Sequence, residues 1–134
     1  MSVEAREWQL ADPAAMAAIA AHFADSPVAI ATYGWTCGVI EGIGPALVRL
    51  TASQVAVRRR IGFAWLWSPG RWLADPGIDV VLSVGLPSRI DSPRFREVVE
   101  PYPGRFMHHF AVQDPAELDP EVAGWLAAAY DAAR

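Results

Sequence analysis

Hydrophobic residues recur with a helical period near both ends of the chain. Asp12-Pro13 and Ser26-Pro27 each place a capping side chain directly before a proline, which is the typical start of a helix. Asp119-Pro120 precedes a third apolar stripe, formed by Val122, Trp125, Leu126, Ala129 and Tyr130. The pattern therefore predicts two N-terminal helices, the second of which ends at "GIGP", and one C-terminal helix.

Between these helices the hydrophobic period changes to two, which is typical of strands. Alternation predicts strands over residues 46–50, 53–57, 63–67, 78–87 and 105–112. The run "RRRIG" at 58–62 is predicted to be the turn of a hairpin. The segment 91–99, "DSPRFREVV", is predicted to be a loop with one helical turn.

Segregated helices and strands predict a single α+β domain over residues 1–134. We expect an antiparallel sheet of about five strands, with all three helices packed on the same face of the sheet. Hydrophobic residues make up 53% of the chain and charged residues 19%, which is typical of a globular domain. The single cysteine fits a cytoplasmic protein, and the longest apolar stretch is too short to cross a membrane.

Aromatic side chains gather in the strand predicted over 63–67. Phe63, Trp65 and Trp67 alternate, so they are expected on one face of the sheet. Core packing is the favoured interpretation, and the floor of a ligand pocket is the alternative.

Arginine residues form a second candidate feature. Arg58, Arg59 and Arg60 sit at the predicted hairpin tip, either simply solvated or as an anion site. Arg71, next to Trp72, would add a cation beside an aromatic ring. However, the net charge of −4 argues against nucleic acid and anionic membranes as partners.

Arg94 differs from the triplet because it follows Ser92-Pro93 and precedes Phe95. An arginine fixed by a proline turn among apolar neighbours is expected to have a carboxylate or backbone carbonyl as its partner. The residue is therefore predicted to be structural or to position a ligand.

Two adjacent histidines in "FMHHF" must point to opposite faces of a strand. His108 shares its face with Phe106 and Phe110, so it is predicted to be buried and depressed in pKa. His109 is predicted to face solvent or a cavity and to titrate near the reference value of about 6.5. A bulge would reverse this assignment.

No motif in the chain assigns a reaction. A phosphate-binding glycine loop, a nucleophile elbow and a metal-ligand spacing are all missing from the sequence. No cofactor, metal or catalytic residue is therefore assigned. His109 would need a carboxylate, serine or cysteine within hydrogen-bond reach to act as a general base.

The chain resembles a bacterial family, the domain of unknown function 5655, from about residue 26 to the C-terminus. The segments that carry the resemblance are "SQVAV", "GFAWLWSPGRWL", "VVLSVGLPSRIDSPRFREVVEP", "HHFAV" and "LDPEVAGWLAAAY". The resemblance implies an α+β domain, found alone or attached to nuclease-like modules, with residues 1–25 as an N-terminal helical extension. Ala52 stands where the family often has a lysine, so any ligand contact of that lysine is missing or is made by Arg49 or Arg58.

Three functions are compatible with these observations. The first is a module that binds a small molecule or a partner protein on an aromatic and arginine-lined sheet face. The others are a nuclease-associated or nucleic-acid accessory module and a small enzyme that uses His109. A homodimer is left open. The candidate ligand-binding residues are Arg58, Arg59, Trp65, Trp67, Arg71, Trp72, Arg94 and His109.

Overall fold

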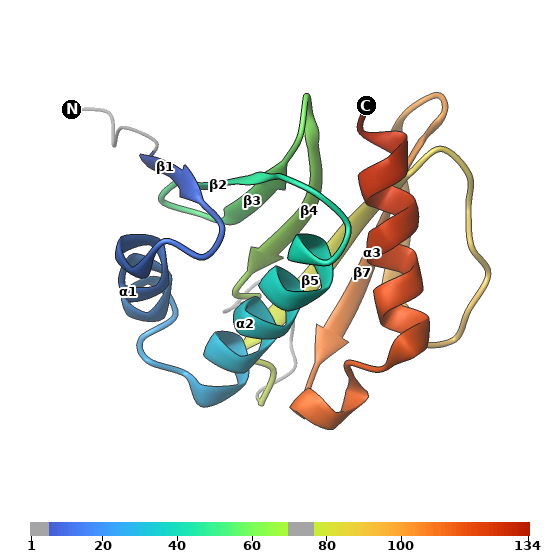
Figure 1. Cartoon of the computed structure of the whole chain (residues 1–134). Coiled ribbons are helices and arrows are strands. Elements are labelled where there is room, and N and C mark those ends of the chain that lie inside the picture. Colours follow the sequence, from blue (N-terminus) through green and yellow to red (C-terminus); the bar gives the residue numbers. More distant parts are fainter. Residues whose placement is uncertain (1–5, 70–76) are drawn as a thin grey trace.

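The computed structural model describes residues 6–69 and 77–134, and the elements within these two ranges form an α+β fold (Figure 1). In chain order they are β1 (Arg6–Gln9), α1 (Pro13–His22), α2 (Pro27–Glu41), β2 (Leu47–Leu50), β3 (Val55–Arg58), β4 (Gly62–Trp67), β5 (Val80–Leu86), β6 (Glu97–Tyr102), β7 (Arg105–Val112), the short 3-10 helix η2 (Pro115–Glu117) and α3 (Pro120–Ala132).

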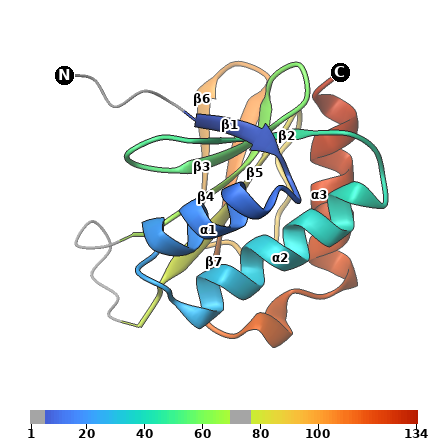
Figure 2. The same cartoon turned by 60° about the vertical axis from the view of Figure 1, so that its left-hand side comes forward.

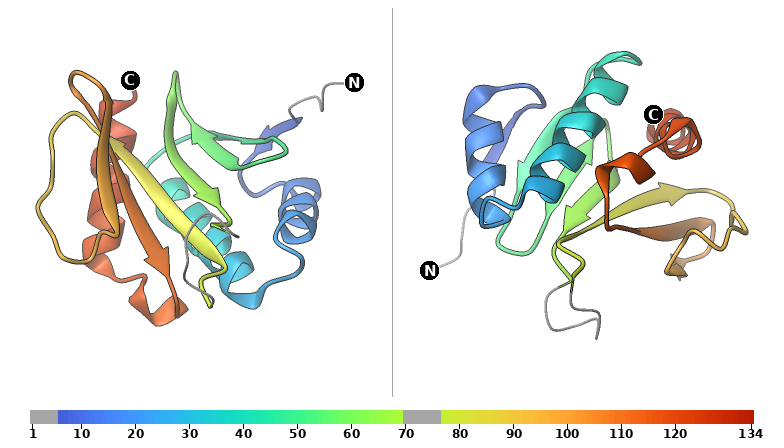
Figure 3. Two further views of the ribbon diagram at one scale, coloured as in Figure 1. Left: turned by 180° about the vertical axis from the view of Figure 1, so that it is seen from behind. Right: turned by 90° about the horizontal axis from the view of Figure 1, so that it is seen from below.

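The strands form one antiparallel sheet in the order β1-β2-β3-β4-β5-β7-β6. The helices lie on one side of this sheet, as the views from behind and from below show (Figure 3). In Figure 2, α1 and α2 lie in front of the strands. The predicted α+β class is confirmed, and the opposite face of the sheet carries no helix among the described residues.

The helix starts follow the predicted caps. Asp12, Ser26 and Asp119 each accept a hydrogen bond from a backbone N–H in the first turn, and a proline follows each of them. These side chains satisfy N–H groups that the helix itself leaves without a partner.

The sheet has two strands more than the five predicted, and both of them are edge strands. β1 is short and mostly exposed, and β6 begins within the segment 91–99 that was predicted to be a loop with a helical turn, so the prediction is wrong for residues 97–99. Edge strands need not bury one face, so their sequences lack the alternation that marks a central strand. Pro101 in β6 fits an edge position because proline cannot donate to the ladder.

The core lies between the sheet and the helices. Trp125 of α3 is 8% exposed, and its ring centroid lies 4.4 Å from that of Phe95 and 6.1 Å from that of Phe110. Trp125 belongs to the apolar stripe predicted for this helix, and its burial against Phe95 and Phe110 anchors α3 on the sheet.

An irregularity in β4 changes which face its aromatic residues occupy. Val57 pairs with Ala64, whereas the next residue of β3, Arg58, pairs with Gly62, so β4 contains one extra residue at this point. Phe63 is fully buried against Tyr130 of α3, whereas Trp65 and Trp67 lie on the helix-free face and are partly buried. The prediction that the three aromatic residues share one face is therefore wrong, and core packing holds for Phe63 alone.

Candidate functional site

A row of residues crosses the helix-free face because strand pairing puts its members directly opposite one another. Trp65 of β4 pairs with Ser83 of β5, and Ser83 pairs with His109 of β7. The complete row runs through Glu7, Arg49, Ala56, Trp65, Ser83, His109 and Glu97. Three polar or aromatic side chains thus meet near the middle of the sheet.

Ser83 joins two rings on this face. The Trp67 indole Nε1–H donates to Ser83 Oγ over 2.8 Å, and Ser83 Oγ lies 2.6 Å from His109 Nδ1. The Trp67 and His109 rings meet edge to face, with centroids 5.6 Å apart. The hydroxyl therefore fixes the orientation of both rings.

These contacts determine which nitrogen of His109 carries the proton. Trp67 can only donate, so the Ser83 proton needs an acceptor elsewhere, and the hydroxyl is only 1% exposed. His109 Nδ1 is the acceptor within reach, so the neutral ring carries its proton on Nε2. No hydrogen bond ties Nε2 to any residue in 6–69 or 77–134.

Burial lowers the pKa of His109, and the nearby Glu97 carboxylate offsets part of this effect. The expectation that His109 titrates near its reference pKa is therefore wrong, because the ring is partly desolvated by its neighbours. Its position on the open side of the strand agrees with the prediction. The imidazole is neutral at pH 7 and offers an N–H donor.

Trp65, Trp67 and His109 line a hollow of about 340 Å³. This volume lies within the range of small-molecule sites, which are mostly apolar with a few placed polar groups. The full lining consists of Ser53, Gln54, Trp65, Trp67, Ser68, Ser83, Met107 and His109.

The other histidine of the pair is structural. His108 is fully buried on the helix-covered face, where its Nε2 accepts from the Ile90 N–H over 3.0 Å. Its Nδ1 lies 3.1 Å from the Phe106 carbonyl oxygen and donates to it. Burial lowers the pKa of His108, as predicted.

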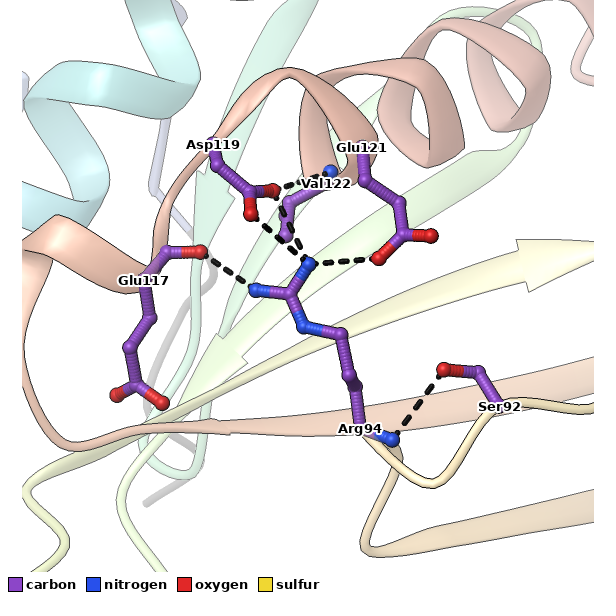
Figure 4. A network of polar contacts seen from close by, with 6 residues as sticks. All are labelled: Ser92, Arg94, Glu117, Asp119, Glu121 and Val122. Atoms are coloured by element: carbon purple, nitrogen blue, oxygen red, sulfur yellow. Dashed lines mark hydrogen bonds and ion pairs between the residues drawn. The ribbon is translucent and has the colours of Figure 1, made fainter.

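Arg94 forms the most extensive polar network among the described side chains (Figure 4). Its guanidinium contacts the Asp119 carboxylate at 3.1 Å, the Glu121 carboxylate at 2.7 Å and the Glu117 carbonyl at 2.8 Å. The same guanidinium lies over the Trp125 ring at 5.6 Å. The predicted partners are confirmed, and Arg94 holds the β5–β6 connection against the start of α3, on the opposite side of the sheet from His109.

We expect that Arg94→Lys lowers the denaturant midpoint and that Arg94→Met lowers it further. A lysine keeps the charge but cannot contact two carboxylates and a carbonyl with one planar fork. Arg89→Met is the matched control, because the Arg89 side chain is 56% exposed and its one ion pair with a described residue is to Asp91, at 3.7 Å. A midpoint for Arg94→Met equal to that of Arg89→Met would contradict the structural role.

The arginine triplet lies apart from the Trp65–His109 hollow. Arg59 donates to the Tyr130 carbonyl over 2.9 Å and stacks on the Tyr130 ring, so it ties the turn between β3 and β4 to the end of α3. Arg58 faces Glu7 at 3.9 Å. With Arg60 they border a different hollow of about 430 Å³, which shares no residue with the first. Arg71 and Trp72 fall outside the described residues.

Sequence reasoning missed three residues of the open face. Nothing in the sequence places Ser83 beside His109. Met107 and Arg105 alternate with His109 in the same strand, but no role was predicted for them. The strand alternation was a usable signal for both, whereas the contact with Ser83 depends on the register between β5 and β7.

The fold and the hollow together define a small α+β domain with a one-sided sheet and an aromatic pocket on the uncovered side. The profile of the family described as "Domain of unknown function (DUF5655)" matches residues 19–133, and the chain belongs to this family. The match begins earlier than the predicted residue 26 and includes the last part of α1. Searches of curated proteins and of solved structures gave no match.

Two further findings concern metal ions and membranes. Within the described ranges, no group of three or more His, Cys, Asp or Glu side chains is placed to hold a metal ion. No helix in the same ranges is long and apolar enough to cross a membrane.

Proposed function

We propose that this domain is a binding module that takes a small planar, largely apolar ligand in the hollow on the open sheet face. The observation that carries the proposal is the Trp67–Ser83–His109 arrangement. It holds two rings in fixed orientations and leaves an imidazole N–H beside Trp65 without a partner among residues 6–69 and 77–134. Such preorganisation reduces the entropy cost of binding.

The contact between Ser83 and His109 also bears on the enzymatic alternative. A nucleophilic serine must be reached by its substrate, but Ser83 is 1% exposed and its oxygen already accepts from Trp67. A histidine that activates a serine is also expected to hold a donor for the developing oxyanion nearby. Within the described part of the chain, the one indole N–H that contacts Ser83 is that of Trp67, and it already donates to the Ser83 hydroxyl, so the arrangement favours binding over acyl transfer.

The nucleic-acid alternative has one feature in its favour, because exposed aromatic rings on a sheet are a common platform for stacked bases. Charge is the opposing feature. The row across the open face ends in Glu7 on one side and Glu97 on the other, so the described residues form no continuous positive strip. The cytoplasmic location stays a prediction, and the homodimer stays open.

Trp67→Phe is expected to weaken binding of the neutral probe naphthalene-2-carboxamide at least about fivefold. The phenyl ring keeps the apolar surface but lacks the N–H that holds Ser83, so both Ser83 and His109 lose their fixed orientation. Wild-type affinity for a fragment of this size is expected to be about millimolar. Binding is followed by tryptophan fluorescence.

Trp8→Phe is the matched control, since Trp8 lies in edge strand β1 outside the hollow. Its affinity for the probe is expected to equal that of wild type. Equal affinities for wild type and Trp67→Phe would contradict the proposed arrangement, and no binding of the probe to wild type at its solubility limit would contradict the proposed function.

A further inference from the structure

We propose that Arg105 binds the carboxylate of the planar aromatic ligand, so that the hollow is a site for an aromatic carboxylic acid. This inference rests on the proposed function and adds the chemical class of the ligand. Arg105 opens β7 and shares the helix-free face with Met107 and His109 because alternate residues of a strand point the same way.

A glycine in the neighbouring strand makes room for the Arg105 side chain. A Cβ atom at Gly85 would lie 2.6 Å from Arg105 Nη2 and 2.8 Å from its Cζ. The guanidinium therefore lies flat across β5 and reaches β4, where Nη2 donates to the Gly62 carbonyl over 2.5 Å. It is also stacked at 5.6 Å from the centroid of the Trp65 ring.

The charge of Arg105 is not neutralised within the described part of the chain. No carboxylate there comes within 4.0 Å of its guanidinium. Arg94 provides the contrast, since it also lies over aromatic rings but contacts both Asp119 and Glu121. A guanidinium carries five N–H donors, so Arg105 keeps donors for a further partner after its bond to Gly62.

The position of Arg105 relative to the hollow suggests how a ligand would lie. Met107 and Trp65 line the hollow. Met107 is the next residue after Arg105 on the same face of β7, and the Arg105 guanidinium stacks on the Trp65 ring. His109 is four positions after Arg105 in β7, which is about 14 Å along the backbone of a strand. A ligand stacked between them meets a cation at one end and an imidazole N–H at the other.

The surrounding charges favour a monoanion in one orientation. Glu97 lies directly opposite His109 in the β6–β7 ladder and repels an anionic group at that end. A single guanidinium matches the charge and planar shape of one carboxylate. A phosphate dianion would need a second cation or a helix N-terminus, and the described lining of the hollow contains neither.

The test compares naphthalene-2-carboxylate with its neutral amide and with 2-naphthyl phosphate, at pH 7.5 and low salt, by fluorescence titration. Wild type is expected to bind the carboxylate at least about tenfold more tightly than the amide, and no more weakly than the phosphate. Arg105→Gln is expected to reduce carboxylate affinity to that of the amide and to leave amide affinity unchanged. Gly85→Ala, whose methyl group displaces the guanidinium, is expected to weaken carboxylate binding as well.

Arg49→Gln is the matched control, because Arg49 is an exposed arginine on the same face in β2, outside the hollow. It is expected to bind all three probes as wild type does. Equal binding of carboxylate and amide, or equal losses in Arg105→Gln and Arg49→Gln, would overturn the role of Arg105 while leaving the proposed function in place. Preferred binding of the phosphate would overturn the carboxylate assignment, and binding of none of the probes would overturn the proposed function itself.

Discussion

Replacing Trp125 with alanine is expected to lower the free energy of unfolding by about 3–5 kcal/mol, as truncations of large buried aromatic residues do. The Trp125 side chain fills the space between α3 and the sheet, against Phe95 and Phe110, and the Arg94 guanidinium stacks on it. Its removal leaves a cavity and also removes one wall of the Arg94 network. The measurement is chemical denaturation followed by circular dichroism.

Trp125→Phe is the control, because it keeps an aromatic ring at the same place and should lose less than half as much stability. The free energy of unfolding should decrease in the order wild type, Trp125→Phe, Trp125→Ala. This order tests whether Trp125 is a core residue, whatever the absolute free energies are. A midpoint for Trp125→Ala within error of wild type would show that α3 is not anchored by this residue.

Replacing His108 with leucine is expected to cost about 2–4 kcal/mol, because a buried donor and a buried acceptor each lose a partner. Leucine fills a comparable volume, but it cannot accept from the Ile90 N–H or donate to the Phe106 carbonyl. His108→Gln is the control, since an amide oxygen can take over the bond from Ile90. It should retain more stability than His108→Leu.

The same residue makes stability depend on pH in a definite direction. Burial lowers the pKa of His108 in the folded state, so between that value and the unfolded value of about 6.5 the unfolded chain binds more protons. Stability from this residue is therefore complete above about pH 6.5 and is lost as the pH falls towards the lowered pKa. His109 and His22 shift in the same direction, so the wild-type curve combines the three.

The contribution of His108 is obtained by subtracting the His108→Gln curve from that of wild type between pH 8 and pH 5. The free energy of unfolding of wild type minus that of His108→Gln should decrease as the pH falls. A difference that stays constant over this interval would mean that His108 keeps the same protonation state in the folded and unfolded chains.

Helices and central strands could be predicted from the sequence because their signals are local. The side chains of Asp12, Ser26 and Asp119 cap the first turn of a helix, so each of them predicts where a helix begins. The alternation of apolar residues in β5 and β7 predicts a strand. The orientation of His108 and His109 followed from the apolar neighbours of His108 and holds in the structure. Edge strands β1 and β6 escaped prediction because little of their surface is buried.

The candidate site could be predicted only in part, because its contacts depend on pairing between distant strands. Trp65 and Trp67 reach the open face through one extra residue in β4, which alternation alone cannot reveal. The Ser83–His109 contact follows from the β5–β7 register, and the path of Arg105 follows from Gly85 in the adjacent strand. Arg58, Arg59 and Arg94 were candidate ligand residues, and each of them contacts other groups of the protein; for Arg94 such a partner was predicted.

The most direct test of the open-face site is to map which NMR resonances move when naphthalene-2-carboxylate is added to the ¹⁵N-labelled protein at pH 7.5. We predict that the indole N–H signals of Trp65 and Trp67 and the ring signals of His109 shift together along one saturating curve. The signals of Trp8 and Trp125, which lie outside the hollow, should stay in place. Shifts confined to the region of Arg59 and Arg60, or no saturable shift at Trp67 and His109, would contradict a ligand site on this face.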